Sequence, residues 1–312
     1  MQTSRREFRV NATRVIRQPV DKQGIVGTLF HPITEGPHPT VLLVHGSLGE
    51  MTEGTAAVLA SAGFSALALL YFGADPLPRE LVEIPLEYFA EAIAWLKTQP
   101  AVDPARIAVM GESKGGELAL LLGATFREDI KAVIASSGSP LVWLEASYRP
   151  LHLIFGSHKS SWMLAGKPLP FLDIRPNLRD VMGLCIGRLP SLTAMHERAL
   201  QDAAAVSTAS IAVERINGPV LLVSHSDDRV WPATRLAEMA IHRLKAHNHP
   251  FPCEHLVYEG AGHPHNLPYS AGEAGKYWSL GLLGGNLKAN GHAQADFWTK
   301  ALDFLEKHLK ND

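Results

Sequence analysis

Short apolar runs alternate with helix-forming segments along most of this chain of 312 residues. Near-continuous apolar runs of this kind are typical of strands that lie in a parallel sheet and are covered on both faces. We expect strands at residues 24–31, 40–44, 64–72, 107–110, 130–135, 220–224 and 255–258, and helices at residues 53–61, 84–98, 113–126, 233–245 and 293–309. The alternation predicts an α/β fold with a doubly wound, mostly parallel sheet, and a single domain over residues 1–312.

The most informative motif is GESKG at residues 111–115, which lies between an apolar run and a helix-forming segment. G-x-S-x-G between a strand and a helix is the nucleophile elbow of the α/β-hydrolase fold, a turn so tight that the positions two before and two after the serine must be small. The first N–H groups of the following helix point to the place where an oxyanion would form. Ser113 is therefore the predicted nucleophile, and the alternative is a serine that only shapes the turn.

A serine nucleophile needs a histidine base, and the base needs a carboxylate that orients it. In this fold the acid follows a late strand and the histidine lies in a later loop. The apolar run at 220–224 leads into HSDDRVWP, and the run at 255–258 leads into EGAGH. Counting back from the Trp-Pro pair favours Asp228 as the acid, with Asp227 as the alternative, and His263 is the predicted base, with His265 as its rival.

The oxyanion hole of such a site needs two backbone N–H groups. One donor should be Lys114, directly after the nucleophile, and the other should lie in the VHGSLG loop at residues 44–49. We predict Ser47 as the second donor, with Leu48 as the alternative. Leu48, Trp162 and Trp231 are the predicted substrate contacts.

One long segment, residues 139–218, breaks the alternation and shows no clear strand pattern. A structureless loop of that length is improbable inside a compact domain. We therefore expect a cap, inserted over the active-site end of the sheet. Its aromatic residues, such as Trp143 and Phe171, either line an acyl pocket or pack the cap onto the domain.

Composition narrows the class of protein further. Apolar residues make up 46% of the chain, charged residues 19%, and the net charge is −2, so neither nucleic acid nor a membrane surface is an expected partner. No apolar run reaches the roughly 18 residues that a membrane span needs. Cys185 and Cys253 lack CxxC partners, which favours a reducing, cytoplasmic compartment. Residues 4–8 (SRREF) are similar to the start of a twin-arginine export signal, but the required apolar stretch does not follow.

Metal catalysis is not expected from the sequence. His225, Asp228, His263 and His265 carry groups that metals bind, but the chain has no HExxH motif and no tight carboxylate pair. We therefore predict a site without a metal or an organic cofactor.

Several segments outside the elbow carry a family resemblance. They are GSLGEMTE at 46–53 with the helix after it, LLYFG at 69–73, DD at 227–228 with Trp231, SW at 161–162 and GKPLPF at 166–171. Together with GESKGGE at 111–117, they resemble the acyl-CoA thioesterase and bile acid-CoA:amino acid N-acyltransferase family. The resemblance implies an α/β-hydrolase that attacks acyl thioesters with Ser113, Asp228 and His263.

The chain departs from the family pattern in two ways. Mammalian members carry an immunoglobulin-like domain ahead of the hydrolase, whereas only the short segment before Gly24 stands there in this sequence. The acyltransferase branch has a cysteine nucleophile, and the serine here favours hydrolysis by water over transfer to an amine.

We therefore expect a small-molecule acyl thioester or ester as the substrate, cleaved through an acyl-enzyme. The alternatives are a carboxylesterase, an acyltransferase with an amine or alcohol acceptor, and a silent binding protein. Cationic groups for the phosphates of CoA would come from the cap, where His158, Lys159, Lys167, Arg175, Arg179 and Arg188 are the candidates or are only solvated surface charges.

Overall fold

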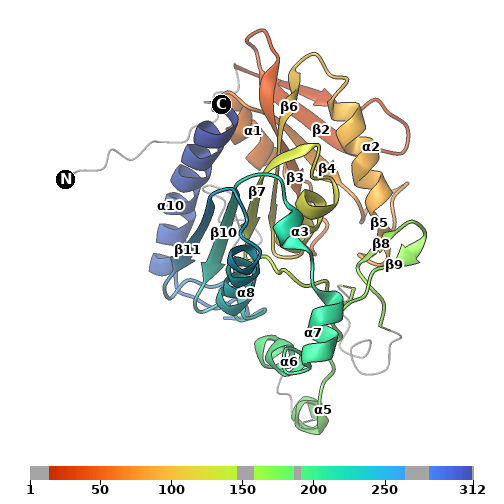
Figure 1. Cartoon of the computed structure of the whole chain (residues 1–312), viewed down its shortest axis with the longest axis vertical. Helices are drawn as coiled ribbons and strands as arrows, with labels where there is room; N and C mark the ends of the chain where they lie inside the picture. Colours follow the sequence, from red (N-terminus) through yellow and green to blue (C-terminus); the bar gives the residue numbers. More distant parts are fainter. Residues whose placement is uncertain (1–13, 146–157, 186–190, 264–280, 311–312) are drawn as a thin grey trace, which may run out of the picture.

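The computed structural model describes residues 14–145, 158–185, 191–263 and 281–310. Its centre is an eight-stranded sheet in the order β1-β2-β4-β3-β6-β7-β10-β11 (Figure 1). The strands are β1 (Val15–Pro19), β2 (Val26–Pro32), β3 (His38–Val44), β4 (Ser65–Leu70), β6 (Val102–Glu112), β7 (Ile130–Ser136), β10 (Val220–His225) and β11 (Cys253–Tyr258). β2 pairs antiparallel with β1 and β4, and all other neighbours are parallel. The predicted doubly wound, mostly parallel sheet is confirmed.

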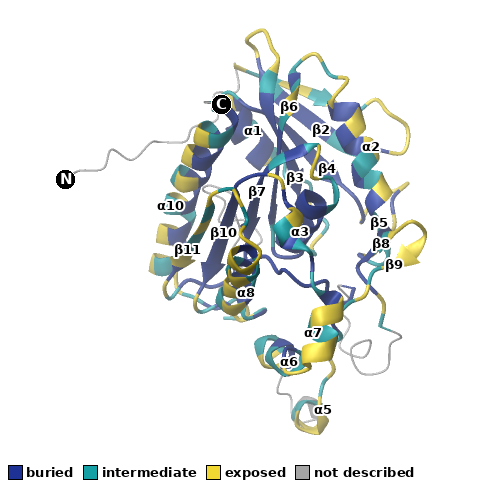
Figure 2. Cartoon of the chain, viewed as in Figure 1, coloured by how far each residue is buried: buried dark blue, intermediate teal, exposed yellow. Residues whose placement is uncertain are grey.

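Helices cover both faces of this sheet. One apolar cluster joins one face to α2 (Leu86–Leu96), α3 (Lys114–Thr125) and α8 (Ala233–Ala246). A second cluster joins the other face to α1 (Glu53–Ser61) and α10 (Leu287–Leu305), which continues into a short π-helix at Glu306–Lys310. In β3, Leu42 belongs to the first cluster and Leu43 to the second, because successive side chains of a strand point to opposite faces. The strands read as continuous apolar runs for this reason, and the buried core follows the sheet (Figure 2).

The structure corrects some of the expected boundaries. α2 begins at Leu86 rather than at 84, since Ile84–Pro85 form the short strand β5. α10 begins at Leu287 rather than at 293, because the side chain of Asn286 accepts a hydrogen bond from the N–H of Ala289 and caps the helix. β1 was not expected at all: it is an edge strand, and its exposed side chains hide the apolar pattern.

The inserted segment contains regular structure that the sequence pattern did not predict. β8 (Trp162–Leu164) pairs with β5 and with β9 (Lys167–Pro168), which makes a second, three-stranded sheet. The helices α5 (Leu178–Cys185), α6 (Leu192–Ala199) and α7 (Ala203–Ala209) follow, and lie beyond one end of the main sheet (Figure 1). An apolar cluster packs Trp143, Leu172 and Met195 of the insertion against Trp231 and Leu236. We propose on this basis that 139–218 is a cap on a single α/β domain.

Candidate active site

The turn between β6 and α3 has the geometry of a nucleophile elbow. Ser113 adopts φ 56° and ψ −123°, a left-handed conformation that is rare for residues with a side chain and that is found where the surrounding structure enforces it. A Cβ atom on Gly111 would lie 2.1 Å from the carbonyl oxygen of Gly115, and one on Gly115 would lie 2.3 Å from the carbonyl oxygen of Val44. Both glycines are therefore required for the turn, and Ser113, with 9% of its surface exposed, lies at the carboxyl edge of the sheet.

Asp228 and His263 form a hydrogen-bonded pair near this edge. Oδ2 of Asp228 accepts from Nδ1 of His263 at 2.7 Å, and the two side chains are only 1% and 8% exposed. Asp228 follows β10 and His263 follows β11, two neighbouring parallel strands. Because Nδ1 of the imidazole faces the carboxylate, its Nε2 is the nitrogen that remains to accept a proton.

The other aspartate of the DD motif, Asp227, lies elsewhere. The side chain of Asp227 is 42% exposed, and its Oδ1 lies 3.5 Å from the guanidinium of Arg229. Its Oδ2 accepts a hydrogen bond of 2.7 Å from the N–H of Gly285. Asp227 thus braces the loop that precedes α10, whereas Asp228 faces the histidine. His265, the rival base, lies outside the described residues.

Ser137 is a residue of this site that sequence reasoning missed. It follows β7, with φ 39°, and its hydroxyl donates to Oδ2 of Asp228 at 3.2 Å and lies 3.0 Å from Nδ1 of His225. Oδ1 of Asp228 accepts from the N–H groups of Val230 and Trp231 at 2.8 Å and 3.2 Å. The carboxylate therefore accepts four hydrogen bonds, two on each oxygen. The signal in the sequence is weak: a serine directly after a buried strand.

Charge and burial act in opposite directions on this pair. Burial is the strongest influence and raises the pKa of Asp228, but the charge and hydrogen bond of His263 and the N–H groups of Val230 and Trp231 together bring it below its ordinary value. Burial is likewise the strongest influence on His263 and lowers its pKa, but the charge and hydrogen bond of Asp228 and the charge of Glu112 raise it above its ordinary value. The site thus favours an ionised acid beside a base that binds a proton readily.

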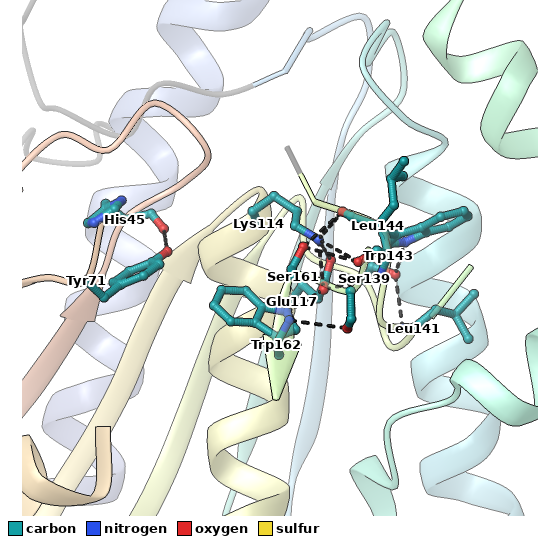
Figure 3. A network of polar contacts seen from close by, with 11 residues as sticks. His45, Tyr71, Lys114, Glu117, Ser139, Leu141, Trp143, Leu144, Ser161 and Trp162 are labelled. Carbon is teal, nitrogen blue, oxygen red and sulfur yellow. Dashed lines mark hydrogen bonds and ion pairs between the residues drawn. The ribbon is translucent and has the colours of Figure 1, made fainter. Parts of the chain in front are cut away.

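The loop that was predicted to supply the second oxyanion donor touches the elbow. A Cβ on Gly46 would lie 3.3 Å from the carbonyl oxygen of Glu112 and 3.5 Å from Cβ of Ser113. Burial lowers the pKa of His45 to about 4, so its imidazole is neutral, and Nδ1 lies 2.8 Å from the carbonyl oxygen of Gly46. The hydroxyl of Tyr71 donates to the carbonyl oxygen of His45, as Figure 3 shows. The two peptide groups that precede Ser47 are therefore each held by a side chain.

The other predicted donor lies at the start of α3. The N–H of Lys114 belongs to the first turn of the helix, where N–H groups have no acceptor within the helix itself. The positive end of the helix dipole also lies here, which favours a developing negative charge.

The three predicted substrate contacts differ in position. Leu48 is 47% exposed beside the oxyanion loop, where a substrate can reach it. Trp231 is 3% exposed, with its ring centroid 6.3 Å from that of His263, so it forms part of the wall behind the base. Trp162 is fully buried and donates to Glu117 at 2.7 Å. It offers no surface to a substrate in this structure.

The basic residues of the cap are mostly paired. Lys159 lies 3.2 Å from Glu83, and Arg175 lies 2.6 Å from Asp173, which also pairs with His158. Lys167 on β9 and Arg179 on α5 are exposed, and Arg188 lies outside the described residues. The side chain of His158 is only 3% exposed. Those of Lys159 and Arg175 are 49% and 70% exposed, so these two remain accessible to an anionic ligand despite their partners.

Two further features of the described part of the chain bear on function. Over residues 14–145, 158–185, 191–263 and 281–310, no group of three or more His, Cys, Asp or Glu side chains is placed to hold a metal ion. Within the same ranges, no helix combines the length and the apolar character that crossing a membrane requires.

Solved structures share this fold. The uncomplexed acylaminoacyl peptidase of Pyrococcus horikoshii superposes with a TM-score of 0.58 at 17% sequence identity, over 95% of this chain and 41% of the peptidase. A dienelactone hydrolase-like promiscuous phosphotriesterase from metagenomic libraries superposes with a TM-score of 0.53 at 17% identity, over 95% of this chain and 99% of that protein. With the strand order and the elbow described above, these similarities show that the chain has the α/β-hydrolase fold.

The sequence comparisons identify the branch of this class. The family model described as "BAAT / Acyl-CoA thioester hydrolase C terminal" matches residues 84–311, and the chain belongs to this family. The peroxisomal succinyl-coenzyme A thioesterase of Mus musculus is 30% identical over 308 residues, which cover 96% of this chain and 66% of the relative. Acyl-coenzyme A thioesterase 6 of Homo sapiens is 31% identical over 304 residues, which cover 95% and 66%. The chain thus spans about two thirds of the length of these relatives.

Proposed function

We propose that this enzyme hydrolyses acyl thioesters of the acyl-CoA type through Ser113, His263 and Asp228. The observation that carries the proposal is the buried hydrogen bond of 2.7 Å between Nδ1 of His263 and Oδ2 of Asp228. The same chain has a serine at the elbow. It also belongs to the family described as "BAAT / Acyl-CoA thioester hydrolase C terminal".

The proposed reaction has two steps. His263 takes the proton of the Ser113 hydroxyl as its oxygen attacks the thioester carbonyl, and Asp228 stabilises the imidazolium that forms. The N–H groups of Lys114 and Ser47 bind the oxyanion, and such donors are typically worth about 3–4 kcal/mol each. His263 then protonates the leaving thiolate. In the second step a water molecule that His263 deprotonates attacks the acyl-enzyme, and His263 returns this proton to the Ser113 oxygen as the ester bond breaks and the acid leaves. The scheme needs neither a metal nor an organic cofactor.

Ser137 has a supporting part in this scheme. Its hydroxyl and the N–H groups of Val230 and Trp231 hold the carboxylate of Asp228 in place, so the carboxylate has one orientation toward His263. Leu48 and the accessible basic side chains of the cap are the proposed contacts for the acyl group and for the phosphates of a CoA leaving group.

A paired turnover assay tests the function. Purified protein is given matched series of acyl-CoA thioesters and p-nitrophenyl esters from short to long chains, with Ser113→Ala as the control. A higher kcat/KM for the thioesters supports the proposal. Fast ester cleavage with negligible thioester cleavage would instead define a carboxylesterase, and product that depends on an added amine, with little free acid, would define an acyltransferase.

The cellular location is a separate proposal. Among the relatives, one is named as peroxisomal and another as mitochondrial, so the family is found in more than one compartment. We propose a cytoplasmic location for this chain on its cysteine content alone, with only two cysteines in the sequence. Fractionation of the source cells, with immunodetection of the native protein, checks it.

A further inference from the structure

A lysine and a glutamate that the proposed reaction does not use form an ion pair in the protein interior. Nζ of Lys114 lies 2.8 Å from Oε2 and 3.0 Å from Oε1 of Glu117, and the side chains are 7% and 0% exposed. Both residues lie in the first turn of α3, directly after Ser113. Lysine and glutamate are almost never fully buried unless they are paired, and a buried pair often adds no stability over apolar residues of the same size. A contribution to stability therefore does not by itself explain why this ion pair is buried.

The pair binds the inserted segment through several polar contacts. Oε1 of Glu117 accepts from the indole N–H of Trp162 at 2.7 Å and from the backbone N–H of Trp143 at 3.3 Å. Nζ of Lys114 lies 3.4 Å from the carbonyl oxygens of both Trp143 and Leu144. The hydroxyl of Ser161 donates to the same two carbonyls. Figure 3 shows these groups converging on the first turn of α3, so the insertion lies directly on the helix that carries the elbow.

The same cluster reaches the second oxyanion loop. The ring of Trp162 packs on Tyr71 with 5.9 Å between the centroids, and Tyr71 stacks on His45 at 4.0 Å and 10°. The hydroxyl of Tyr71 also fixes the carbonyl of His45. Lys114 and the loop with Ser47, the two proposed donors, are thus supported by one continuous group of buried side chains.

We propose that Lys114 and Glu117 are positioning residues, whose ion pair fixes the inserted segment on the first turn of α3 and holds the Lys114 N–H in the direction of the oxyanion. The inference depends on the proposed serine mechanism. The side chain of Lys114 is held at its far end by four oxygens, so the peptide N–H at its near end has little freedom to rotate. A donor must lie within hydrogen-bond distance of the oxyanion to lower the barrier, and small displacements of such groups have large effects on rate.

The test measures the rate per folded active site, so that a loss of positioning is distinguished from a loss of folded protein. Lys114→Met keeps the N–H and the length of the side chain, Glu117→Gln keeps an oxygen acceptor for Trp162, and the double variant leaves no unpaired charge. Each protein is titrated to completion with a fluorophosphonate that labels Ser113, and kcat is expressed per labelled site. We expect each single variant to lose about tenfold in kcat per site, with a parallel loss in affinity for a trifluoromethyl ketone that mimics the oxyanion.

The double variant makes the result decisive. Removing both charges should restore thermal stability, because no uncompensated charge stays buried, but kcat per site should stay low. Wild-type kcat per site in the double variant would overturn the proposal, because the pair would then act on stability alone. If a single variant fails to fold, the double variant still decides the question. Trp162→Phe, which loses the indole N–H together with part of the ring, tests the same contact with Glu117.

A matched control lies far from the elbow. Arg243 and Glu214 form a partly buried ion pair of 2.8 Å between α8 and the turn before β10. Glu214→Gln should lower Tm without changing kcat per site. Failure of the proposed function has a different signature, because the wild-type enzyme itself would then not turn over thioesters, whether or not the fluorophosphonate labels Ser113.

Discussion

Asp228 and His263 are 35 residues apart in the chain, yet Oδ2 of one accepts a 2.7 Å hydrogen bond from Nδ1 of the other. The contact exists because β10 and β11 are parallel neighbours, with Ser224 opposite Val257 and His225 opposite Tyr258 in the register. The two loops after these strands therefore leave the sheet at the same edge. The parallel sheet thus brings together two groups that no local motif connects.

Removal of the nucleophile should abolish turnover without unfolding the protein. Ser113→Ala is expected to lose on the order of 10⁴-fold or more in kcat, because no other group in the scheme forms the acyl-enzyme. The measurement is thioester hydrolysis with Tm as the control for folding. A full-rate Ser113→Ala enzyme would refute the serine mechanism.

The two aspartates should differ sharply. Asp228→Asn is expected to lower kcat about 10⁴-fold, as an amide at this place favours the wrong imidazole tautomer. Asp227→Asn should cost less than about tenfold, since Asp227 is partly exposed and binds Gly285 and Arg229. Steady-state kinetics on both variants decide the acid, and the reverse order of severity would assign it to Asp227.

The pH profile should follow the titration of His263. Asp228 and Glu112 hold the pKa of His263 above its ordinary value of 6.5, and only the neutral imidazole is a base. kcat/KM should therefore rise with pH and level off above this raised pKa. Asp228→Asn removes the negative charge that faces the ring, so the midpoint of the residual activity should move to lower pH.

The same pKa shift has a consequence for stability. A histidine with a raised pKa in the folded state binds its proton more tightly when folded, so its contribution is complete below the unfolded pKa and is lost as the pH rises through the folded pKa. The stabilities of wild type and Asp228→Asn should accordingly be compared by urea unfolding at pH values on both sides of this range. The difference that is due to His263 should shrink toward high pH.

Loss of the Ser137 hydroxyl should weaken the orientation of the acid. Ser137→Ala leaves Oδ2 of Asp228 with His263 as its remaining partner among the contacts described here, and we expect kcat to fall about tenfold. Because the carboxylate then has one donor fewer, its pull on the imidazolium is stronger, and the midpoint of the pH profile should move slightly upward. An unchanged kcat and profile would show that the N–H groups of Val230 and Trp231 suffice.

Tyr71→Phe should affect catalysis through the oxyanion loop. The variant keeps the stacking on His45 but loses the hydrogen bond to its carbonyl, and we expect a fall in kcat of about three- to tenfold. Tyr88→Phe is the matched control, because the Tyr88 hydroxyl donates to the carbonyl of Leu70 and not to the oxyanion loop. That control should change stability only, and equal losses of kcat in both variants would argue against a role for Tyr71 in the loop.

The sequence predicts those parts of the molecule that depend on local pattern. The apolar runs gave the parallel strands, and the GESKG motif gave the turn at Ser113, because tight turns restrict which residues fit. The edge strand β1 and the short strands β8 and β9 escaped prediction, since exposed strands and strands of two or three residues carry no clear periodicity.

Residues whose role depends on the tertiary structure were harder to interpret. Ser137 acquires its contact with Asp228 only when β7 and β10 lie side by side. Trp162 is predicted to contact substrate because it is aromatic and lies in the proposed cap. In the structure its side chain is buried and its indole N–H donates to Glu117. The spacing of Lys114 and Glu117 is visible in the sequence, but their burial depends on a segment that returns some thirty residues later, at Trp143 and Leu144.

The contacts of the insertion with α3 set a limit on how this scaffold can be re-engineered. Exchange of the helical part between Leu178 and Ala209 for that of a relative would change part of the proposed cap and keep the contacts of Trp143 and Trp162 with Glu117. An exchange that also takes Trp143 and Trp162 removes partners of Glu117. The insertion thus has a helical part and a part that contacts α3. We expect a graft that exchanges only the helical part to change which acyl group the enzyme prefers and to keep its turnover.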